Sequence, residues 1–216
     1  MSENMVGFYA NVKVLEQEEV FRRFFCKLSE KRKQKIEAIK AEGGRRSSLG
    51  AWTLVDDGLQ QLYDLCERDV TIAYGPHGKP YVKERTDIHF NLSHSGDYVL
   101  AVFAPVEVGC DIQQIGEVKN HARIAARFFT EDEQAAIAQG MDFYRVWARK
   151  ESYIKCLGDG MARDLRSFSV VEDLSDARQR QLHFAEHELP GYVLAVCYDH
   201  KDVYPVQWQE LNFVNI

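Results

Sequence analysis

Apolar and polar positions along the chain follow two kinds of pattern, and together they predict a mixed fold. Segments with helical spacing of apolar residues cover 17–26, 30–41, 47–66, 118–128, 131–138 and 142–157. Short apolar runs bounded by turn residues predict strands over 6–14, 70–73, 88–93, 99–104, 108–113, 167–172 and 193–198. Thr130 and Glu133 form a capping box that starts the fifth helix.

Two parts of the chain resemble each other, which indicates an internal duplication. Residues 98–104 (YVLAVFA) recur as residues 192–198 (YVLAVCY), and Trp52 recurs as Trp147 at nearly the same displacement. The matches are short, so chance is the alternative. We expect an α+β fold of two similar α/β halves, residues 1–106 and 107–216, related by a pseudo-twofold axis. Each half would be a small antiparallel sheet packed on a long helix, and the cleft between them is a natural ligand site.

Composition and charge restrict the class of protein. With 45% hydrophobic and 28% charged residues, the chain is typical of a globular protein. It contains no apolar run of the roughly 18 residues that a membrane helix needs, and its N-terminus does not resemble a secretory signal. We therefore expect a cytoplasmic location. The five cysteines are scattered without a C-x-x-C pair, which argues against a disulfide framework or a zinc knuckle.

The net charge of −6 is unevenly distributed. Residues 22–46 contain ten Lys or Arg against three Glu, in a chain that is otherwise acidic. This balance disfavours a general nucleic-acid binder. The basic segment could hold a phosphorylated small molecule or an acidic partner, or it could be a solvated helix face.

A candidate metal site lies in residues 108–113. On a strand, Asp111 and Gln113 point to one face, and Cys110 and Ile112 to the other. A carboxylate beside an amide oxygen suits Mg²⁺, which also binds substrate phosphates. Gly109 would let another group approach the backbone. The alternative is an aspartate that ends a strand and caps a turn.

A second candidate lies in residues 147–155. Helical spacing places Trp147, Glu151 and Lys155 on one face. Glu151 could bind metal or accept a proton while Lys155 holds a phosphate. The alternative is an exposed Glu–Lys pair worth about 0.3 kcal/mol.

Three turns carry further polar residues. Ser93-His94-Ser95-Gly96 offers hydroxyls, an imidazole and backbone N–H groups to an anion, or is a plain polar turn. Residues 75–80 are not a P-loop, because their glycine spacing is wrong, and they form a rigid turn that presents Lys79. Arg46 follows two glycines where a helix opens, a suitable place for a phosphate.

Together and in this order, these segments resemble the phosphopantetheinyl transferase superfamily, in the longer two-copy form that activates non-ribosomal peptide and polyketide synthetases. The resemblance runs from about Lys31 to Leu165. It is strongest at Gly109-Cys110-Asp111 and at Trp147-x-x-Lys150-Glu151-Ser152-x-x-Lys155. The segments Phe90-Asn91-Leu92-Ser93-His94-Ser95 and Gly78-Lys79-Pro80 match as well.

The resemblance implies a role for each matching residue. Asp111 and Glu151 are implied ligands of Mg²⁺, with Mn²⁺ as a substitute, and Glu151 also activates the attacking serine. Gln113 stands where the family usually has a second acidic residue and would bind metal directly or through a water. The implied coenzyme A contacts are Lys155 at the pyrophosphate, Arg46, Ser93 and His94 at the 3′-phosphate and nearby phosphates, Lys79 and Pro80 beside the adenine, and Lys31 at the cleft mouth.

The function implied by the resemblance is transfer of 4′-phosphopantetheine from coenzyme A to a serine of an acyl, peptidyl or aryl carrier protein, with release of 3′,5′-ADP. The enzyme would be a monomeric holo-carrier-protein synthase that binds neither nucleic acid nor membrane. Gln113 supports one alternative, a non-catalytic paralogue that binds coenzyme A or a carrier. Another is an interaction domain that docks a protein through its basic segment.

Overall fold

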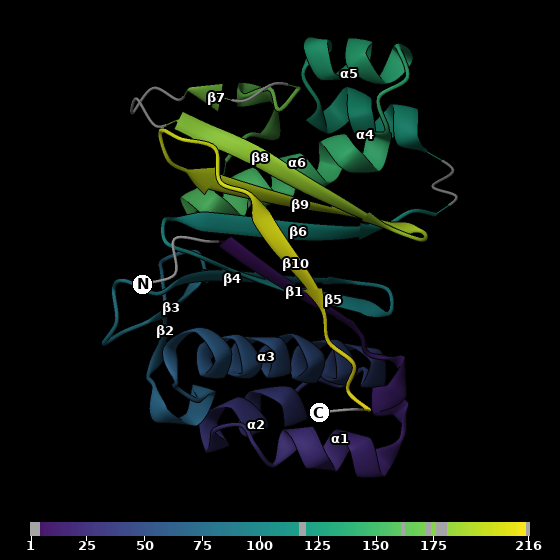
Figure 1. Cartoon of the computed structure of the whole chain (residues 1–216). Helices are drawn as coiled ribbons and strands as arrows, with labels where there is room; N and C mark the ends of the chain where they lie inside the picture. Colours follow the sequence, from purple (N-terminus) through teal and green to yellow (C-terminus); the bar gives the residue numbers. More distant parts are fainter. Residues whose placement is uncertain (1–4, 117–119, 161–162, 172–173, 176–180, 215–216) are drawn as a thin grey trace.

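The structure, a computed structural model, describes residues 5–116, 120–160, 163–171, 174–175 and 181–214 (Figure 1). The helices are α1 (Glu18–Phe25), α2 (Glu30–Glu37), α3 (Glu42–Tyr63), α4 (His121–Phe128), α5 (Glu131–Ala138) and α6 (Phe143–Leu157), with short 3₁₀ helices η1 (Lys13–Glu16), η2 (Glu67–Asp69) and η4 (Leu165–Ser167). The strands are β1 (Met5–Asn11), β2 (Ile72–Tyr74), β3 (Pro80–Val82), β4 (His89–Ser95), β5 (Tyr98–Ala104), β6 (Val108–Gln114), β7 (Leu174–Ser175), β8 (Gln181–Leu189), β9 (Tyr192–Asp199) and β10 (Val206–Glu210). None of the described helices is both long and apolar enough to span a bilayer.

The strands form two four-stranded sheets and a separate hairpin. The first sheet has the order β10-β1-β5-β4 and the second the order β6-β9-β8-β7, while β2 and β3 pair only with each other. Neighbouring strands are antiparallel except β1 and β10, which are parallel. The end of the chain therefore returns to the first sheet, where β10 lies beside β1 (Figure 1).

The two halves repeat the same order of elements, which confirms the predicted α+β fold of two similar halves. In the first half, β1 leads through α3 to the β4–β5 hairpin, and the sheet order is β1-β5-β4. In the second half, β6 leads through α6 to the β8–β9 hairpin, and the order is β6-β9-β8. The repeated apolar sequence forms β5 in one half and β9 in the other.

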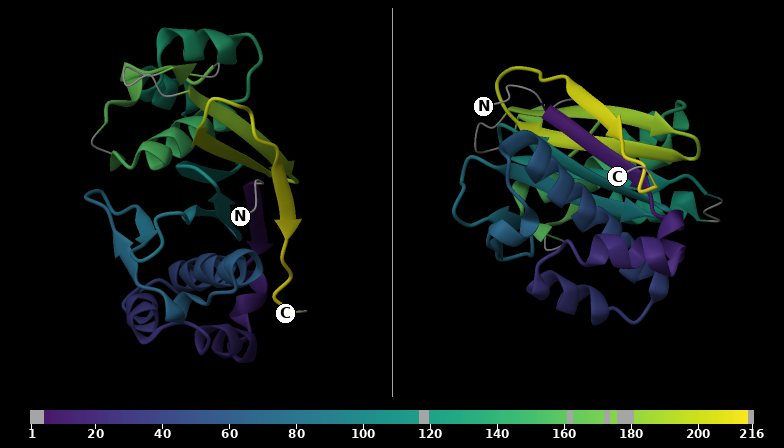
Figure 2. Two further views of the ribbon diagram at one scale, coloured as in Figure 1. Left: turned by 60° about the vertical axis from the view of Figure 1, so that its left-hand side comes forward. Right: turned by 60° about the horizontal axis from the view of Figure 1, so that its bottom comes forward.

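The core explains why these two strands are apolar on both faces. In β5, Val99, Ala101 and Phe103 pack toward α3, while the alternate residues pack against β6 and β9. Since side chains alternate along a strand, a strand that lies between a helix and a second sheet buries both of its faces. The molecule thus has two sheets between two groups of helices, α1–α3 and α4–α6 (Figures 1 and 2).

One predicted strand, over residues 167–172, is wrong. Its beginning belongs to η4, and residues 168–171 are irregular. Side chains of α6 bind the carbonyl groups of this segment, since Arg149 donates to the carbonyl oxygens of Val170 and Val171. Lys150 donates to the carbonyl oxygens of Leu165 and Phe168. These carbonyl groups therefore have hydrogen-bond donors without a neighbouring strand.

Other boundaries differ by smaller amounts. The α3 helix begins at Glu42, five residues before the predicted start, and includes the two glycines in its first turn. The expected helix over 118–128 begins at His121, and its predicted positions 118 and 119 lie outside the described residues. Strands β3, β7, β8 and β10 were not predicted.

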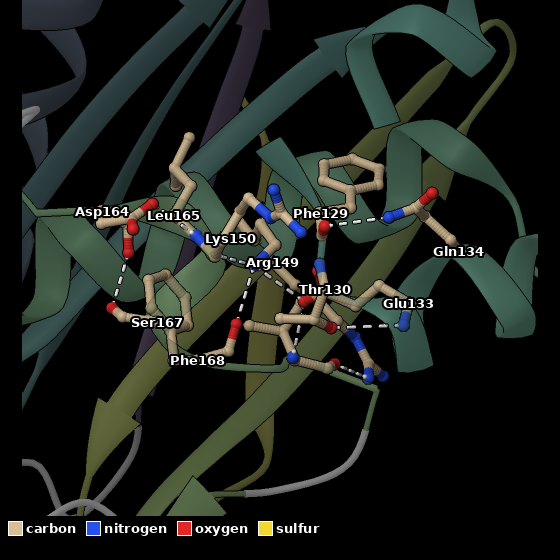
Figure 3. Close-up of polar contacts among 12 residues, drawn as sticks. Phe129, Thr130, Glu133, Gln134, Arg149, Lys150, Asp164, Leu165, Ser167 and Phe168 are labelled. Carbon is tan, nitrogen blue, oxygen red and sulfur yellow. Dashed lines mark hydrogen bonds and ion pairs between the residues drawn. The ribbon is translucent and has the colours of Figure 1, made fainter. Parts of the chain in front are cut away.

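A buried ion pair anchors α6 to α5 (Figure 3). Lys150 Nζ lies 2.9 Å from Glu133 Oε1, and the two side chains are 1% and 0% exposed. The same oxygen accepts a hydrogen bond from Val170 N at 2.9 Å. Glu133 also completes the predicted capping box, because its Oε2 accepts from Thr130 N at 2.8 Å. Two helices and the irregular segment thus meet at one pair of charges.

The α6 helix also lies unusually close to β6. A Cβ atom built on Gly109 would lie 2.1 Å from Cys156 N and 2.2 Å from Ser152 O. Glycine is therefore required for this contact. The predicted approach of another group at Gly109 is an approach of α6 itself.

Replacing Glu133 with Gln tests the buried pair, because Gln at this position can still complete the capping box. We expect the free energy of unfolding to fall by about 3–5 kcal/mol, since the Lys150 charge stays buried without its partner. Urea denaturation measures this change. The exposed Glu131→Gln on the same helix should change it by less than about 0.5 kcal/mol. Equal effects of the two variants would contradict a stabilising role, and adding Lys150→Met to Glu133→Gln should recover part of the loss.

Gly109→Ala tests the helix–strand contact. We expect a loss of several kcal/mol or failure to fold, because the added methyl group overlaps backbone atoms that cannot rotate away. Thermal unfolding or the soluble yield measures the effect. Gly43→Ala in the first turn of α3 is the matched control, since the added methyl group would have the flexible Arg46 guanidinium 3.9 Å away as its nearest neighbour. That variant should be neutral or slightly stabilising. A soluble Gly109→Ala protein with unchanged stability would show that α6 does not depend on this contact.

Candidate active site

Strand β6 supplies the centre of the site through Asp111, which is 3% exposed. Its Oδ1 accepts hydrogen bonds from Lys155 Nζ at 2.6 Å and from Ser93 Oγ at 2.8 Å. Its Oδ2 accepts from Gln113 Nε2 at 2.6 Å. Lys155 also donates to Ser93 Oγ at 2.9 Å. Residues far apart in the sequence, from β4, β6 and α6, thus share one hydrogen-bond network.

The contact of the two sheets places β4 beside β6. Backbone N–H groups of β6 bind side chains of β4, since Cys110 N donates to Asn91 Oδ1 at 2.9 Å and Gln114 N to Ser95 Oγ at 3.0 Å. Asn91 was not predicted to have this role. No local pattern indicates it, because its partner comes from the other half of the chain.

The α6 helix brings Glu151 and Lys155 to the same face, as its spacing predicts. Trp147, on that face, packs against the rings of Phe128, Phe129 and Phe143. Lys155 forms its ion pair with Asp111. No ion pair or hydrogen bond joins Glu151 to any residue that the structure describes, so the alternative of a simple Glu–Lys pair is wrong.

Charges in the site shift three pKa values. Burial and the charge of Asp111 raise the pKa of Glu151 above its ordinary value. Burial alone would lower the pKa of Lys155, but the neighbouring acidic groups, Asp111 foremost, together outweigh it and the pKa is raised. Desolvation and the Lys155 ammonium lower the pKa of His94. Two carboxylates that repel each other therefore lie beside one ammonium group.

The donor set fits Mg²⁺. This ion is usually bound through one or two protein carboxylates, with waters and substrate phosphates completing its shell, and Asp111 and Glu151 offer two carboxylates. Within the described residues, no group of three His, Cys, Asp or Glu side chains could hold a metal ion. In this arrangement Gln113 is a hydrogen-bond donor to Asp111, and its role as a metal ligand stays a prediction.

A cavity of about 270 Å³ adjoins this network. The lining residues come from the 77–80 turn, β4 and the end of α6: His77, Gly78, Lys79, Pro80, Asn91, Leu92, Ile154, Lys155, Gly158 and Gly160. The cavity lies between the two halves and brings together three predicted contacts of coenzyme A: Lys79, Pro80 and Lys155. Ser93 joins them through its hydrogen bond to Lys155, and the exposed His94 follows it on β4.

Two predicted residues lie elsewhere. Lys31 lines a cavity of about 210 Å³ together with Arg32, Lys35 and Tyr74. Arg46 lines a cavity of about 430 Å³ at η1, α1 and the start of α3, and its guanidinium lies 3.3 Å from Glu16. Neither cavity shares a lining residue with the one that contains Lys155. Their contacts with phosphate stay predictions.

Comparisons with known proteins match both halves of the chain. Residues 16–105 match a family model described as the N-terminal part of 4′-phosphopantetheinyl transferase, and residues 107–197 match one described as the 4′-phosphopantetheinyl transferase superfamily. The chain is 32% identical to the 4′-phosphopantetheinyl transferase Sfp of Bacillus subtilis (strain 168), over 95% of this chain and 98% of that protein.

Other relatives agree. The chain is 34% identical to the 4′-phosphopantetheinyl transferase psf-1 of Bacillus pumilus, over 71% of this chain and 70% of the relative. It is also 34% identical to the 4′-phosphopantetheinyl transferase AcpT of Salmonella typhi, over 72% and 78%. The resemblance seen in the sequence is thereby confirmed, and this chain belongs to the 4′-phosphopantetheinyl transferase superfamily.

Proposed function

We propose that this chain is a holo-carrier-protein synthase, which transfers 4′-phosphopantetheine from coenzyme A to a serine of an apo acyl, peptidyl or aryl carrier protein. The observation that carries the proposal is the cluster of Asp111, Glu151 and Lys155, of which Lys155 also lines the cavity between the two halves. The relatives Sfp and AcpT are both named 4′-phosphopantetheinyl transferases, which supports the same reaction.

Coenzyme A would lie along the cavity between the halves. Lys79 and Pro80 would flank the adenine, and Ser93, His94 and Lys155 would bind phosphate oxygens. Asp111 and Ser93 hold the Lys155 ammonium in a fixed position at the cavity, so it would meet the pyrophosphate already oriented. Arg46 and Lys31 would extend the phosphate contacts.

In the reaction, the carrier serine Oγ forms a bond to the phosphorus that carries pantetheine. The bond from that phosphorus to the bridging oxygen of the pyrophosphate breaks, and 3′,5′-ADP leaves with the electron pair. Glu151 accepts the serine proton. Asp111 and Glu151 would hold Mg²⁺ or Mn²⁺, with Gln113 contributing directly or through a water, and the ion would supply positive charge to the pyrophosphate.

Three further features are proposed with the function: a division of the chain at residue 106, a monomeric state and a cytoplasmic location. Strand β10 belongs to the second half of the chain but pairs with β1 in the first sheet. The two halves would therefore form one rigid unit, which needs no second copy of the chain.

Intact-mass spectrometry of an apo carrier incubated with this protein, coenzyme A and Mg²⁺ tests the proposal. We expect a mass gain of one phosphopantetheine group, which a chelator abolishes. Glu151→Gln should reduce turnover by at least about 100-fold, the usual contribution of a general base, and leave the circular dichroism spectrum unchanged. Glu19→Gln, a change at an exposed position on α1, is the control. If acyl, peptidyl and aryl carriers all stay unmodified while coenzyme A binds, the protein is the non-catalytic alternative.

Gln113→Glu tests whether a cation binds beside this position. A third carboxylate next to Asp111 and Glu151 is repelled, so the melting temperature in chelator should fall below that of the original protein. Mg²⁺ should then raise the melting temperature of the variant by about 2–4 °C more than that of the original protein, which corresponds to about 1 kcal/mol. Gln114→Glu, on the opposite face of β6, is the matched control. An equal Mg²⁺ effect in all three proteins would contradict a metal site at Gln113.

A further inference from the structure

Glu107, in the connection between β5 and β6, links elements from both halves of the protein. Its Oε2 accepts a hydrogen bond from Lys79 Nζ at 2.6 Å. Its Oε1 lies 3.2 Å from His89 Nδ1 on β4. No part of the sequence pattern singled out Glu107, because its partners lie 28 and 18 residues away along the chain.

Lys79 makes a second contact, which reaches the end of α6. Its Nζ donates to the carbonyl oxygen of Cys156 at 2.9 Å. The last carbonyls of a helix have no partner within the helix, and a cation near them is favourable. A Cβ atom on Gly158 would lie 3.5 Å from Lys79 Cδ, so the lysine stem also packs on the helix end. Lys79 therefore bridges Glu107 and α6.

The strands of the hairpin that carries this turn are held by Ile72 and Val82 in the core around α3 and by a hydrogen bond from Arg32 to Tyr74, so Lys79 acts on the turn beyond them. Strands β2 and β3 have three residues each and form a two-stranded sheet by themselves. Such a hairpin is marginally stable alone, so contacts with the rest of the protein must hold it in place. The Lys79 ammonium makes two of these contacts, and one of them is with Glu107.

We propose that Glu107 is a positioning residue for the binding of coenzyme A. It holds Lys79 against the end of α6. The cavity wall formed by Lys79, Pro80 and Lys155 thereby keeps the geometry that binds coenzyme A. This inference rests on the proposed function. The His89 hydrogen bond and the Lys79 charge, opposed by burial, lower the pKa of Glu107 to about 2. The carboxylate is therefore ionised at neutral pH.

A competing role predicts the opposite effect. If Glu107 only neutralised the Lys79 ammonium, it would compete with an anionic substrate for that ammonium. Its removal would then tighten the binding of coenzyme A. If it positions Lys79, its removal weakens binding, because the ammonium and the turn must then be ordered when the ligand binds. The sign of the change in affinity therefore separates the two.

Calorimetric titration with coenzyme A and Mg²⁺ provides the test. The proteins are the unmodified chain, Glu107→Gln, Lys79→Met, the double variant, and Glu19→Gln as a matched change at an exposed glutamate. We expect Glu107→Gln to raise the Kd by about tenfold, in the range for a hydrogen bond to a charged group. The KM for coenzyme A should rise equally, with kcat and the KM for the carrier within about twofold. The double variant should bind no more weakly than Lys79→Met, because Glu107 acts through Lys79.

Unchanged or tighter binding of coenzyme A by Glu107→Gln would overturn the inference. Additive effects of Glu107→Gln and Lys79→Met on the Kd would overturn it as well. A purely structural role would lower the melting temperature without this split between KM and kcat. If the unmodified chain modifies carriers but Glu107→Gln does so with an unchanged KM, only the inference fails. If the unmodified chain neither binds coenzyme A nor modifies any carrier, the proposed function fails and the inference fails with it.

Discussion

The contact of α6 with β6 at Gly109 is the constraint on which the candidate site depends. The helix lies so close that a single methyl group would overlap its backbone. At this separation Lys155 reaches the carboxylate of Asp111, two residues further along the strand. A larger residue at position 109 would move the helix outward, and the ammonium and carboxylate would then separate. Because the backbones of α6 and β6 lie so close together, the Lys155 ammonium and the Asp111 carboxylate also lie close together.

Lys150 and Glu151, which are neighbours on α6, face different environments and have different roles. Lys150 points into the protein, where Glu133 and two carbonyl groups surround its ammonium. Lys155 pairs with Asp111 and lines the cavity, and Glu151 lies within the charge field of Asp111. A buried ion pair is weak support for stability compared with apolar packing, but its geometry is demanding. The pair therefore restricts the rotation of α6 and keeps Glu151 on the side of Asp111.

The sequence predicted what local patterns determine and missed what depends on distant partners. The alternation in β6 and the spacing in α6 placed Asp111, Glu151 and Lys155 on the correct faces. The strand predicted over 167–172 is wrong over the described residues 167–171, because side chains of α6 that lie 18 and 21 residues earlier bind carbonyls there. Asn91 and Glu107 were missed for the same reason. The phosphate contact expected for Arg46 stays a prediction, since its guanidinium lies beside Glu16 in another cavity and nothing there tests it.

The duplication also explains why the two halves share one candidate site. Asp111 pairs with Ala195 in β9, and the corresponding residue of the first half, paired with Ala101 in β5, is Phe8. Phe8 is buried in the core against α3. On the helices, the displacement that relates Trp52 to Trp147 relates Asp56 to Glu151, yet Asp56 accepts a hydrogen bond from Glu67 N and holds η2. The first copy therefore uses its equivalent positions for packing, contributes Lys79 and Pro80 of its hairpin to the cavity, and contributes Ser93 of its edge strand to the network of Asp111. The result is one site at the junction, with acidic groups from the second copy, basic groups from both copies and a hydroxyl group from the first.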